Sequence, residues 1–336
     1  MKTQISDRVL EIEESKSIGL AAEVHKLKLE GKKILSLNVG EPEFSTHPAI
    51  LKATIEALNE GKTKYSLVSG IHDLREKIAK RCAKKWNFKL TSKNILVGSG
   101  SKNILYSVFQ TILNPRDEVL IPAPFWVTFP ESIKLAGGVP KVVPTNENLD
   151  LDIEEIKKAI TKKTKAIIIN SPCNPSGRVY HESSLKELAK VADEYDLIVI
   201  ADEAYEGMVY DGHEMTHFAA LSETAFKRTL TVQSFSKSFC MTGFRVGYVV
   251  ASEDVISMIN KFQGHMLGNI PEFSQVGAIK ALDFEQEIIS DLQEKMQKRK
   301  ELTVKLFSQI FDFPEPEGAF YIFPDASAYI GKSVGD

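Results

Sequence analysis

The chain has 336 residues, of which 43% are hydrophobic and 26% are charged, a balance typical of a globular protein with a large core. Its formal net charge of −3 argues against the broad basic field that binds nucleic acids or anionic membranes. The sequence contains no apolar run of about 18 residues, so no membrane-spanning helix is predicted.

The cysteines and the first residues indicate the compartment. Cys82, Cys173 and Cys240 have neither metal-binding nor redox spacing, so we expect reduced thiols and no metal site. The opening stretch MKTQISDRVLEIEESKS lacks the apolar region of a signal peptide. These features predict a cytoplasmic protein.

The N-terminal part alternates between predicted helices and loops. Residues 1–30 have helical spacing, and residues 34–37 favour a short strand. The following loop contains Gly40, which is either a turn glycine or a site where a ligand carboxylate approaches the backbone. Further helices are predicted over residues 48–60 and 71–87. Tyr65 stands in the polar loop between them.

A strand, a turn of small residues and a helix follow one another over residues 95–113. The turn Gly98-Ser99-Gly100-Ser101 lies before the predicted helix 102–113, where backbone N–H groups and the helix dipole favour an anion. The third glycine of a dinucleotide fingerprint is replaced by Asn103, so a nicotinamide site is not favoured. The next predicted strand, 118–122, runs toward Trp126, which places an aromatic ring near a strand end.

Strands and helices then alternate up to residue 250. Strands are predicted over 139–143, 166–169, 197–201, 229–232 and 246–250, with helices over 153–161 and 184–195. Apolar strands that alternate with helices predict a mostly parallel sheet covered on both faces. Beyond residue 253 the pattern is helical, with a long charged helix over 286–311 and an edge strand over 317–323.

The stretch around Lys237 carries the strongest chemical hypothesis. Lys237 follows the apolar strand 229–232, with Ser234 and Ser236 before it and Arg245 after it. We expect Lys237 to hold pyridoxal phosphate covalently, while the two serines and the arginine bind the phosphate dianion.

Residues at other strand ends support this hypothesis. Asp202 ends a buried strand, where it is either a helix N-cap or the partner of a protonated pyridine nitrogen. Asn174 belongs to an Asn-Pro-Ser-Gly run, which is either a simple turn or an amide donor to the phenolic oxygen of the cofactor. Trp126 is suited to stack on a planar ring.

The chain resembles the class I aminotransferases of the aspartate aminotransferase fold, which are fold type I pyridoxal-phosphate enzymes. The resemblance runs from about Ser6 to the end of the chain. It is carried by Asn38-Val39-Gly40-Glu41-Pro42, Gly100-Ser101-Lys102, Pro124-Phe125-Trp126, Asn174-Pro175-Ser176-Gly177, Asp202-Glu203-Ala204-Tyr205, Ser234-Phe235-Ser236-Lys237 and Gly243-Phe244-Arg245-Val246-Gly247-Tyr248.

The resemblance implies a fold and a set of site residues. The implied fold is a mostly parallel seven-stranded sheet with helices on both faces, plus a smaller α+β domain. The implied segments are an N-terminal arm with part of the small domain (1–45), a large cofactor-binding domain (46–290) and a small domain (291–336). The implied cofactor ligands are Lys237, Asp202, Asn174, Tyr205, Trp126, Ser234, Ser236, Arg245, Ser101 and Lys102, with Tyr65 reaching across a homodimer interface.

The implied reaction is ping-pong transamination between an L-amino acid and a 2-oxo acid. Gly40, Asn174 and Trp126 are implied contacts of the substrate, the first two at its α-carboxylate. Lys102 at the start of a helix is electrostatically unfavourable unless an anion lies nearby. In the most similar branch such a lysine contacts the distal carboxylate, which favours aspartate and 2-oxoglutarate, with prephenate or aromatic amino acids as alternatives.

One departure from the family pattern lowers the expected activity. The family's arginine for the substrate α-carboxylate lies beyond the point at which this sequence stops, after Ser333-Val334-Gly335-Asp336. The small domain is therefore expected to be incomplete, and the chain to bind the cofactor but transaminate poorly.

Three other classes of protein remain as alternatives. Ser234-x-x-Lys237 matches the pattern of Ser-Lys acyl enzymes, but the companion triplets S-D-N and K-T-G are absent from the sequence. A lyase or decarboxylase that uses the same cofactor, and a cofactor-binding protein without activity, are the other two.

Overall fold

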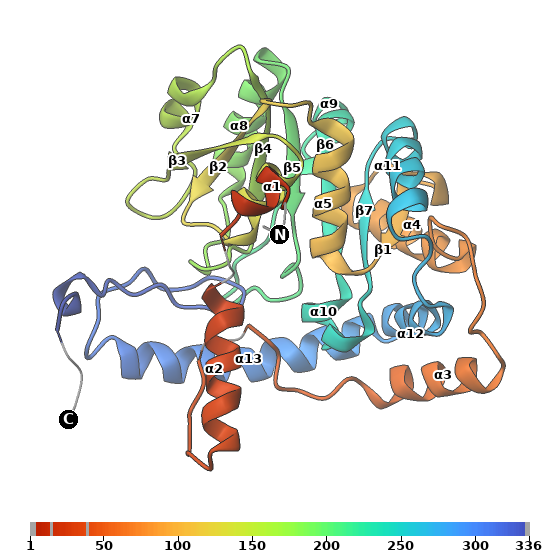
Figure 1. Cartoon of the computed structure of the whole chain (residues 1–336), viewed down its shortest axis with the longest axis horizontal. Coiled ribbons are helices and arrows are strands. Elements are labelled where there is room, and N and C mark those ends of the chain that lie inside the picture. The colour runs from red at the N-terminus through yellow and green to blue at the C-terminus, as the bar shows by residue number, and fades with distance from the viewer. Residues whose placement is uncertain (1–4, 14–15, 38–39, 333–336) are drawn as a thin grey trace.

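The computed structural model describes residues 5–13, 16–37 and 40–332. Its sheet has seven strands in the order β1-β7-β6-β5-β4-β2-β3 (Figure 1). β7 is antiparallel to both of its neighbours, β1 and β6, and every other neighbouring pair is parallel. The bounds are β1 Ile95–Gly98, β2 Glu118–Ala123, β3 Val139–Pro144, β4 Thr164–Asn170, β5 Ile198–Asp202, β6 Thr229–Ser234 and β7 Gly247–Val250. The predicted mostly parallel seven-stranded sheet is confirmed.

The helices predicted over 48–60, 71–87, 102–113, 153–161 and 184–195 are present with ends within two residues of those bounds, whereas α6, α9 and α10 were not predicted. α4 ends at Asn87, whose left-handed φ of 54° terminates the helix. The bounds are α1 Asp7–Leu10, α2 Lys16–Leu29, α3 Pro48–Asn59, α4 His72–Trp86, α5 Gly100–Ile112, α6 Thr128–Leu135, α7 Ile153–Ala159, α8 Glu182–Glu194, α9 Glu223–Arg228, α10 Phe235–Ser238, α11 Glu253–Met266, α12 Glu272–Asp283 and α13 Glu285–Phe307.

Helices cover both faces of the sheet. Successive residues of a strand point to opposite faces, and here those on both faces are apolar. Leu96, Ile121 and Ile168 pack with α5, α6 and α11 on one face. On the other face, Val97 packs with α4 and α12, and Ile167 packs with α7, α8 and α9. The strands are therefore buried on both sides, and their polar ends become the place where a site can form.

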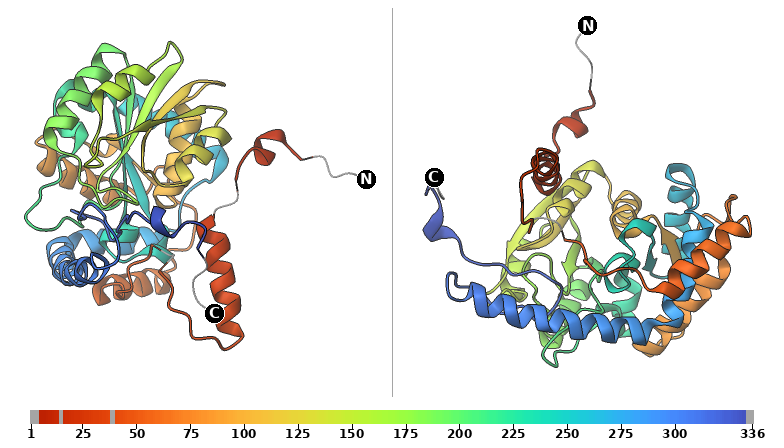
Figure 2. Two further views of the ribbon diagram at one scale, coloured as in Figure 1. Left: turned by 90° about the vertical axis from the view of Figure 1, so that its left-hand side faces the viewer. Right: turned by 90° about the horizontal axis from the view of Figure 1, so that it is seen from below.

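The long helix α13 and the N-terminal helices lie outside this layered body. α13 runs along one side of the molecule, while α2 stands away from it (Figures 1 and 2). Leu292 and Met296 of α13 pack against a small cluster that includes Tyr205, Phe320 and Tyr321. This contact brings the C-terminal segment to the loop that follows β5.

Two predicted strands are wrong. Residues 34–37 are loop, and Leu35 is 99% exposed, because no neighbouring strand in the described part of the chain pairs with this segment. Asn38 and Val39, which belong to the quoted motif, lie outside the described residues. The segment 317–323 makes only an isolated bridge between Gly318 and Val209, because Ala319 takes a left-handed φ of 57° that interrupts the extended backbone.

Candidate active site

A cavity of about 350 Å³ lies where β4, β5 and β6 end. In an open α/β sheet the carboxyl ends of the strands are where ligands bind. Of the residues predicted from the sequence, the cavity is lined by Gly40, Ser101, Trp126, Asn174, Asp202, Tyr205 and Lys237. Trp126, Asn174 and Tyr205 lie in the loops that follow β2, β4 and β5, and Asp202 ends β5. Because these parallel strands end at the same edge of the sheet, residues distant in sequence meet here.

Lys237 lies on the short helix α10, directly after β6. The hydroxyl of Ser234 accepts a hydrogen bond from the backbone N–H of Ser236 at 3.0 Å and so starts the helix. The Nζ of Lys237 donates to the carbonyl oxygen of Gly40 at 2.6 Å. Burial lowers the pKa of Lys237, and the charge of Arg245 lowers it further, although Glu41 opposes both. At neutral pH a larger fraction of such a lysine is unprotonated than of one in water, and only the unprotonated amine can act as a nucleophile or base.

Asp202 ends β5 with its side chain almost fully buried. Burial raises the pKa of Asp202 to about 7, partly opposed by a hydrogen bond from the backbone N–H of Ala204 at 3.2 Å. The neighbouring charge of Glu203 raises this pKa further. Because ionisation of Asp202 is disfavoured by its surroundings, a cation bound in the cavity would gain a strong partner by stabilising the carboxylate.

Asn174 and Tyr205 point their polar groups at one place in the cavity. The Nδ2 of Asn174 donates to the hydroxyl of Tyr321 at 3.3 Å, and the hydroxyls of Tyr205 and Tyr321 are 2.7 Å apart. The backbone N–H of Asn174 donates to the Oδ1 of Asn170 at 2.7 Å, which fixes the loop. An amide donor and a phenol hydroxyl on one spot suit a phenolic or carboxylate oxygen.

A second group of residues surrounds the start of α5 beside Ser101. A side-chain carbon at Gly100 would stand 2.5 Å from the Nη2 of Arg245, and one at Gly247 would stand 2.7 Å from the backbone nitrogen of Ser101. Only glycine allows this close approach of the guanidinium to the helix N-terminus. A guanidinium and a helix N-terminus are both favourable for a phosphate or carboxylate.

Lys102 does not line the cavity, but it lies beside Trp126, which does. The Nζ of Lys102 lies 5.0 Å from the centroid of the Trp126 ring. Burial lowers the pKa of Lys102, and Arg245 lowers it further. Two cations near one helix N-terminus indicate that this part of the site attracts anions.

Other predicted residues do not border the cavity directly. Ser234 and Ser236 are buried next to Lys237, and Arg245 contacts the carbonyl oxygens of Ser99 at 3.3 Å and Thr242 at 3.0 Å. The structure does not bring Tyr65 to the cavity, because its side chain is 98% exposed in the loop after α3.

The sequence did not single out Tyr321 or Asn170, which also line the cavity. Burial raises the pKa of Tyr321 to about 12, so its hydroxyl keeps its proton at neutral pH. The aromatic run Phe320-Tyr321 was visible in the sequence, but the predicted edge strand gave no reason to place it at the site. Asn170 ends β4 beside Asp202 in the strand register, a position shared by the other site residues.

Neither a metal centre nor a membrane span is found in the described part of the chain. Residues 5–13, 16–37 and 40–332 contain no group of three or more His, Cys, Asp or Glu arranged to hold a metal ion. Within the same part of the chain, no helix is both long and apolar enough to cross a membrane. All three cysteines are free thiols.

Comparison with known proteins identifies the family. The family described as "Aminotransferase class I and II" matches residues 32–333. The chain belongs to this aminotransferase family. A probable aspartate/prephenate aminotransferase of Aquifex aeolicus is 39% identical to it, with 100% of this chain and 87% of the relative aligned. The aspartate aminotransferase of Bacillus subtilis is 37% identical over 96% of this chain and 83% of the relative.

Solved structures of aminotransferases have the same fold. Aspartate aminotransferase from Thermus thermophilus with maleate superposes with a TM-score of 0.94 at 32% identity, covering 98% of this chain and 87% of the other. Aspartate aminotransferase from Thermotoga maritima gives a TM-score of 0.91 at 36% identity, covering 96% and 85%. The protein is therefore an aminotransferase with the aspartate aminotransferase fold.

Proposed function

We propose that this aminotransferase uses pyridoxal phosphate to move the amino group of aspartate to 2-oxoglutarate. The observation that carries the proposal is the cavity itself, which holds an amine of lowered pKa, Lys237, together with a buried carboxyl of raised pKa, Asp202. The amine of Lys237 can bond to the aldehyde of the cofactor, and the carboxyl of Asp202 can pair with its pyridine nitrogen. When bound, the cofactor supplies an electron sink for the negative charge that develops at the substrate Cα.

The residues present fit this cofactor on observations of the structure. Asp202 has a buried carboxyl that a pyridinium would stabilise, and Asn174 and Tyr205 offer donors to a phenolic oxygen. The guanidinium of Arg245 lies close against Gly100, the first residue of α5, and a cation beside a helix N-terminus suits a phosphate. Ser101, Ser234 and Ser236 would complete the phosphate site, and Trp126 would cover the ring.

The protein's own groups then perform the proton transfer. Lys237 would hold the cofactor through its Nζ, and this amine would be free while the substrate amine occupies that place. The free Nζ would take up the proton from the substrate Cα, and the lowered pKa of Lys237 keeps more of the amine unprotonated and able to do so. Gly40 and Asn174 both lie beside the hydroxyl of Tyr321 in the cavity and are proposed to bind the substrate α-carboxylate. The amino donor and the oxo acid bind to the same residues in turn, so ping-pong kinetics are expected.

Lys102 supports the assignment of a dicarboxylic substrate. Its ammonium lies over the ring of Trp126, which lines the cavity, and we propose that it pairs with a second carboxylate beyond the reacting carbon. The named relatives from Aquifex aeolicus and Bacillus subtilis are aminotransferases of aspartate or of aspartate and prephenate. The Thermus thermophilus structure was solved with maleate, which is also a dicarboxylate.

We propose further that two copies associate so that Tyr65 enters the partner's phosphate site. The support is its 98% exposed side chain, together with the exposed apolar residues Leu51, Ile55 and Leu58 on the neighbouring helix α3. The molecular mass in solution tests this: a monomer at micromolar concentration would contradict it.

An absorbance titration tests the main proposal. The purified protein with pyridoxal phosphate is expected to show a visible band, which aspartate removes and 2-oxoglutarate restores. Lys237→Ala is the control and is expected to lack the band. A band that survives in Lys237→Ala, or one that aspartate leaves unchanged, would contradict the proposal.

A further inference from the structure

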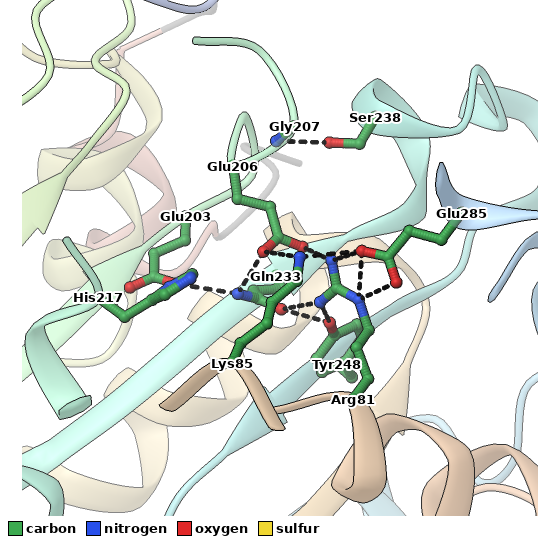
Figure 3. Close-up of polar contacts among 10 residues, drawn as sticks. All are labelled: Arg81, Lys85, Glu203, Glu206, Gly207, His217, Gln233, Ser238, Tyr248 and Glu285. Atoms are coloured by element: carbon green, nitrogen blue, oxygen red, sulfur yellow. Dashed lines mark hydrogen bonds and ion pairs between the residues drawn. The ribbon is translucent and has the colours of Figure 1, made fainter. Parts of the chain in front are cut away.

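A network of buried polar side chains lies behind the cavity (Figure 3). Gln233 stands at its centre on β6, four residues before Lys237, and is 1% exposed. Around it are Glu203 and Glu206 from the loop after β5, Arg81 from α4 and Tyr248 from β7. Sequence reasoning gave none of these side chains a role.

Every hydrogen-bonding position of the Gln233 amide is used. Its Nε2 donates to the Oε2 of Glu203 at 2.8 Å and to the Oε2 of Glu206 at 3.2 Å. Its Oε1 accepts from the Nη1 of Arg81 at 3.2 Å and from the hydroxyl of Tyr248. An amide offers two donors and one oxygen with two lone pairs, so no other side chain of this size could satisfy two carboxylates and two donors at once.

The two carboxylates belong to the segment that carries two cavity residues. Asp202 and Tyr205 line the cavity, while Glu203 and Glu206, which follow each of them directly, bond to Gln233 instead. The segment is therefore held from the side opposite to the cavity. A second tie joins the same two stretches, since the backbone N–H of Gly207 donates to the Oγ of Ser238 at 3.3 Å (Figure 3).

The remaining members hold the network rigid. The Nη2 of Arg81 pairs with the Oε1 of Glu206 at 2.5 Å, and its Nε lies 2.9 Å from both carboxylate oxygens of Glu285, the first residue of α13. The Nδ1 of His217 lies 2.7 Å from the Oε2 of Glu203. Because most of these groups are buried and have more than one partner, displacement of any one of them weakens several pairs at once.

We propose that Gln233 is a positioning residue for amino transfer, which fixes the segment bearing Asp202 and Tyr205 against the segment bearing Lys237. The inference rests on the proposed roles of those three residues. Gln233 lies four residues before Lys237, and Ser238 directly follows Lys237. The hydrogen bonds of Gln233 and Ser238 therefore both hold the stretch that presents the lysine. Small shifts between Asp202 and Lys237 change how the two act on opposite ends of one ring.

The variants Gln233→Met and Ser238→Ala test this in the protein loaded with pyridoxal phosphate. Gln233→Met keeps the length of the side chain and removes its four hydrogen bonds, and Ser238→Ala removes the second tie. The control is Asp150→Asn in a second buried polar cluster. Asp150 is buried and pairs with His181 at 3.2 Å, as Glu203 pairs with His217, but it does not line the cavity.

The readouts separate positioning from mere stability. A ring nitrogen that is less well paired with Asp202 holds its proton less tightly, and the neutral ring withdraws less electron density. The pH at which the bound chromophore titrates is therefore expected to rise by about half a unit or more. We expect kcat to fall about tenfold in Gln233→Met, as for outer partners of other functional groups, while KM for aspartate changes by less than about twofold. Ser238→Ala is expected to shift both readouts in the same direction by less.

Thermal unfolding completes the design. If Gln233→Met and Asp150→Asn lose similar stability and have the same spectrum and kcat, the positioning role is overturned. If Gln233→Met does not fold, Ser238→Ala decides: an unchanged chromophore and kcat in that variant overturns the inference. Failure of the proposed function is seen separately, because wild-type protein would then lack the aspartate-sensitive band.

Discussion

Two carboxylates four residues apart, Asp202 and Glu206, experience opposite surroundings although both are buried. Burial raises the pKa of Asp202 to about 7. At Glu206 the charges of Arg81 and Lys85 outweigh burial and lower the pKa to about 2. One segment thus presents a carboxyl in need of a cation to the cavity, and one already paired to the network behind it. Burial alone therefore does not set the charge state of a carboxyl. That state also depends on whether a cationic partner comes from the protein or from a ligand.

The largest effect is expected from removing the carboxyl that faces the cavity. Asp202→Asn removes the group that stabilises a positive ring nitrogen, so kcat is expected to fall about 1,000-fold, or about 4 kcal/mol. Single-turnover rates with aspartate measure this. A kcat within about tenfold of wild type would remove Asp202 from its proposed role.

The same variant has an opposite effect on the stability of the cofactor-free protein. Because the folded pKa of Asp202, about 7, lies above its value of about 3.9 in an unfolded chain, folding becomes less favourable as pH rises between these values. Asn does not ionise, so the stability of Asp202→Asn relative to wild type is expected to increase from pH 4 to 7 and then level off. Urea unfolding across this range checks the sign.

Breaking the network side should act mainly on stability. Arg81→Met removes the buried cation that Glu206 and Glu285 share and leaves them only the half-exposed Lys85, at an expected cost of about 3 kcal/mol in the free energy of unfolding. Arg228→Met is the control, since Arg228 pairs with the exposed Asp193 and Asp196, and its loss should change little. Equal effects of the two substitutions would contradict the distinction.

A smaller effect is expected at the substrate end of the cavity. Lys102→Ala should weaken transition-state binding of aspartate by about 1.5–3 kcal/mol, the worth of a hydrogen bond between charged groups. The measurement is kcat/KM for aspartate, compared with an amino acid that has an apolar side chain. Equal losses for both amino acids would show that Lys102 does not read the second carboxylate.

The smallest expected effect is a pH-dependent one at His217. Glu203 raises the pKa of His217 despite burial, with a further contribution from Glu206, while Lys85 acts in the opposite direction. The pairing therefore stabilises the fold fully below the unfolded pKa of about 6.5 and is lost as pH rises through the higher folded value. His217→Gln should destabilise the protein at pH 6 and much less at pH 9, as measured by urea unfolding.

Most elements of the sheet were predictable because each strand is a short apolar run between turn residues. The stretches that ended in Asp202 and Lys237 carried both the strand signal and the chemistry. The failures lie where a local pattern was overridden: residues 34–37 found no partner strand, and the left-handed Ala319 interrupted the predicted strand 317–323. Tyr321 was missed for the same reason, because an edge strand would not have brought its hydroxyl to Tyr205.

The class of chemistry was predictable from the sequence, since residue types at strand ends and the Ser234-x-Ser236-Lys237 run limit what the site can bind. The charge states of those residues, and the side chains that support them, depend on how the elements pack. Asp202 and Glu206 are similar in sequence, yet their pKa values diverge because one faces the cavity and the other faces Arg81. Gln233 showed no pattern at all. Its position between two carboxylates and two donors exists only once α4, β6, β7 and the loop after β5 are packed together.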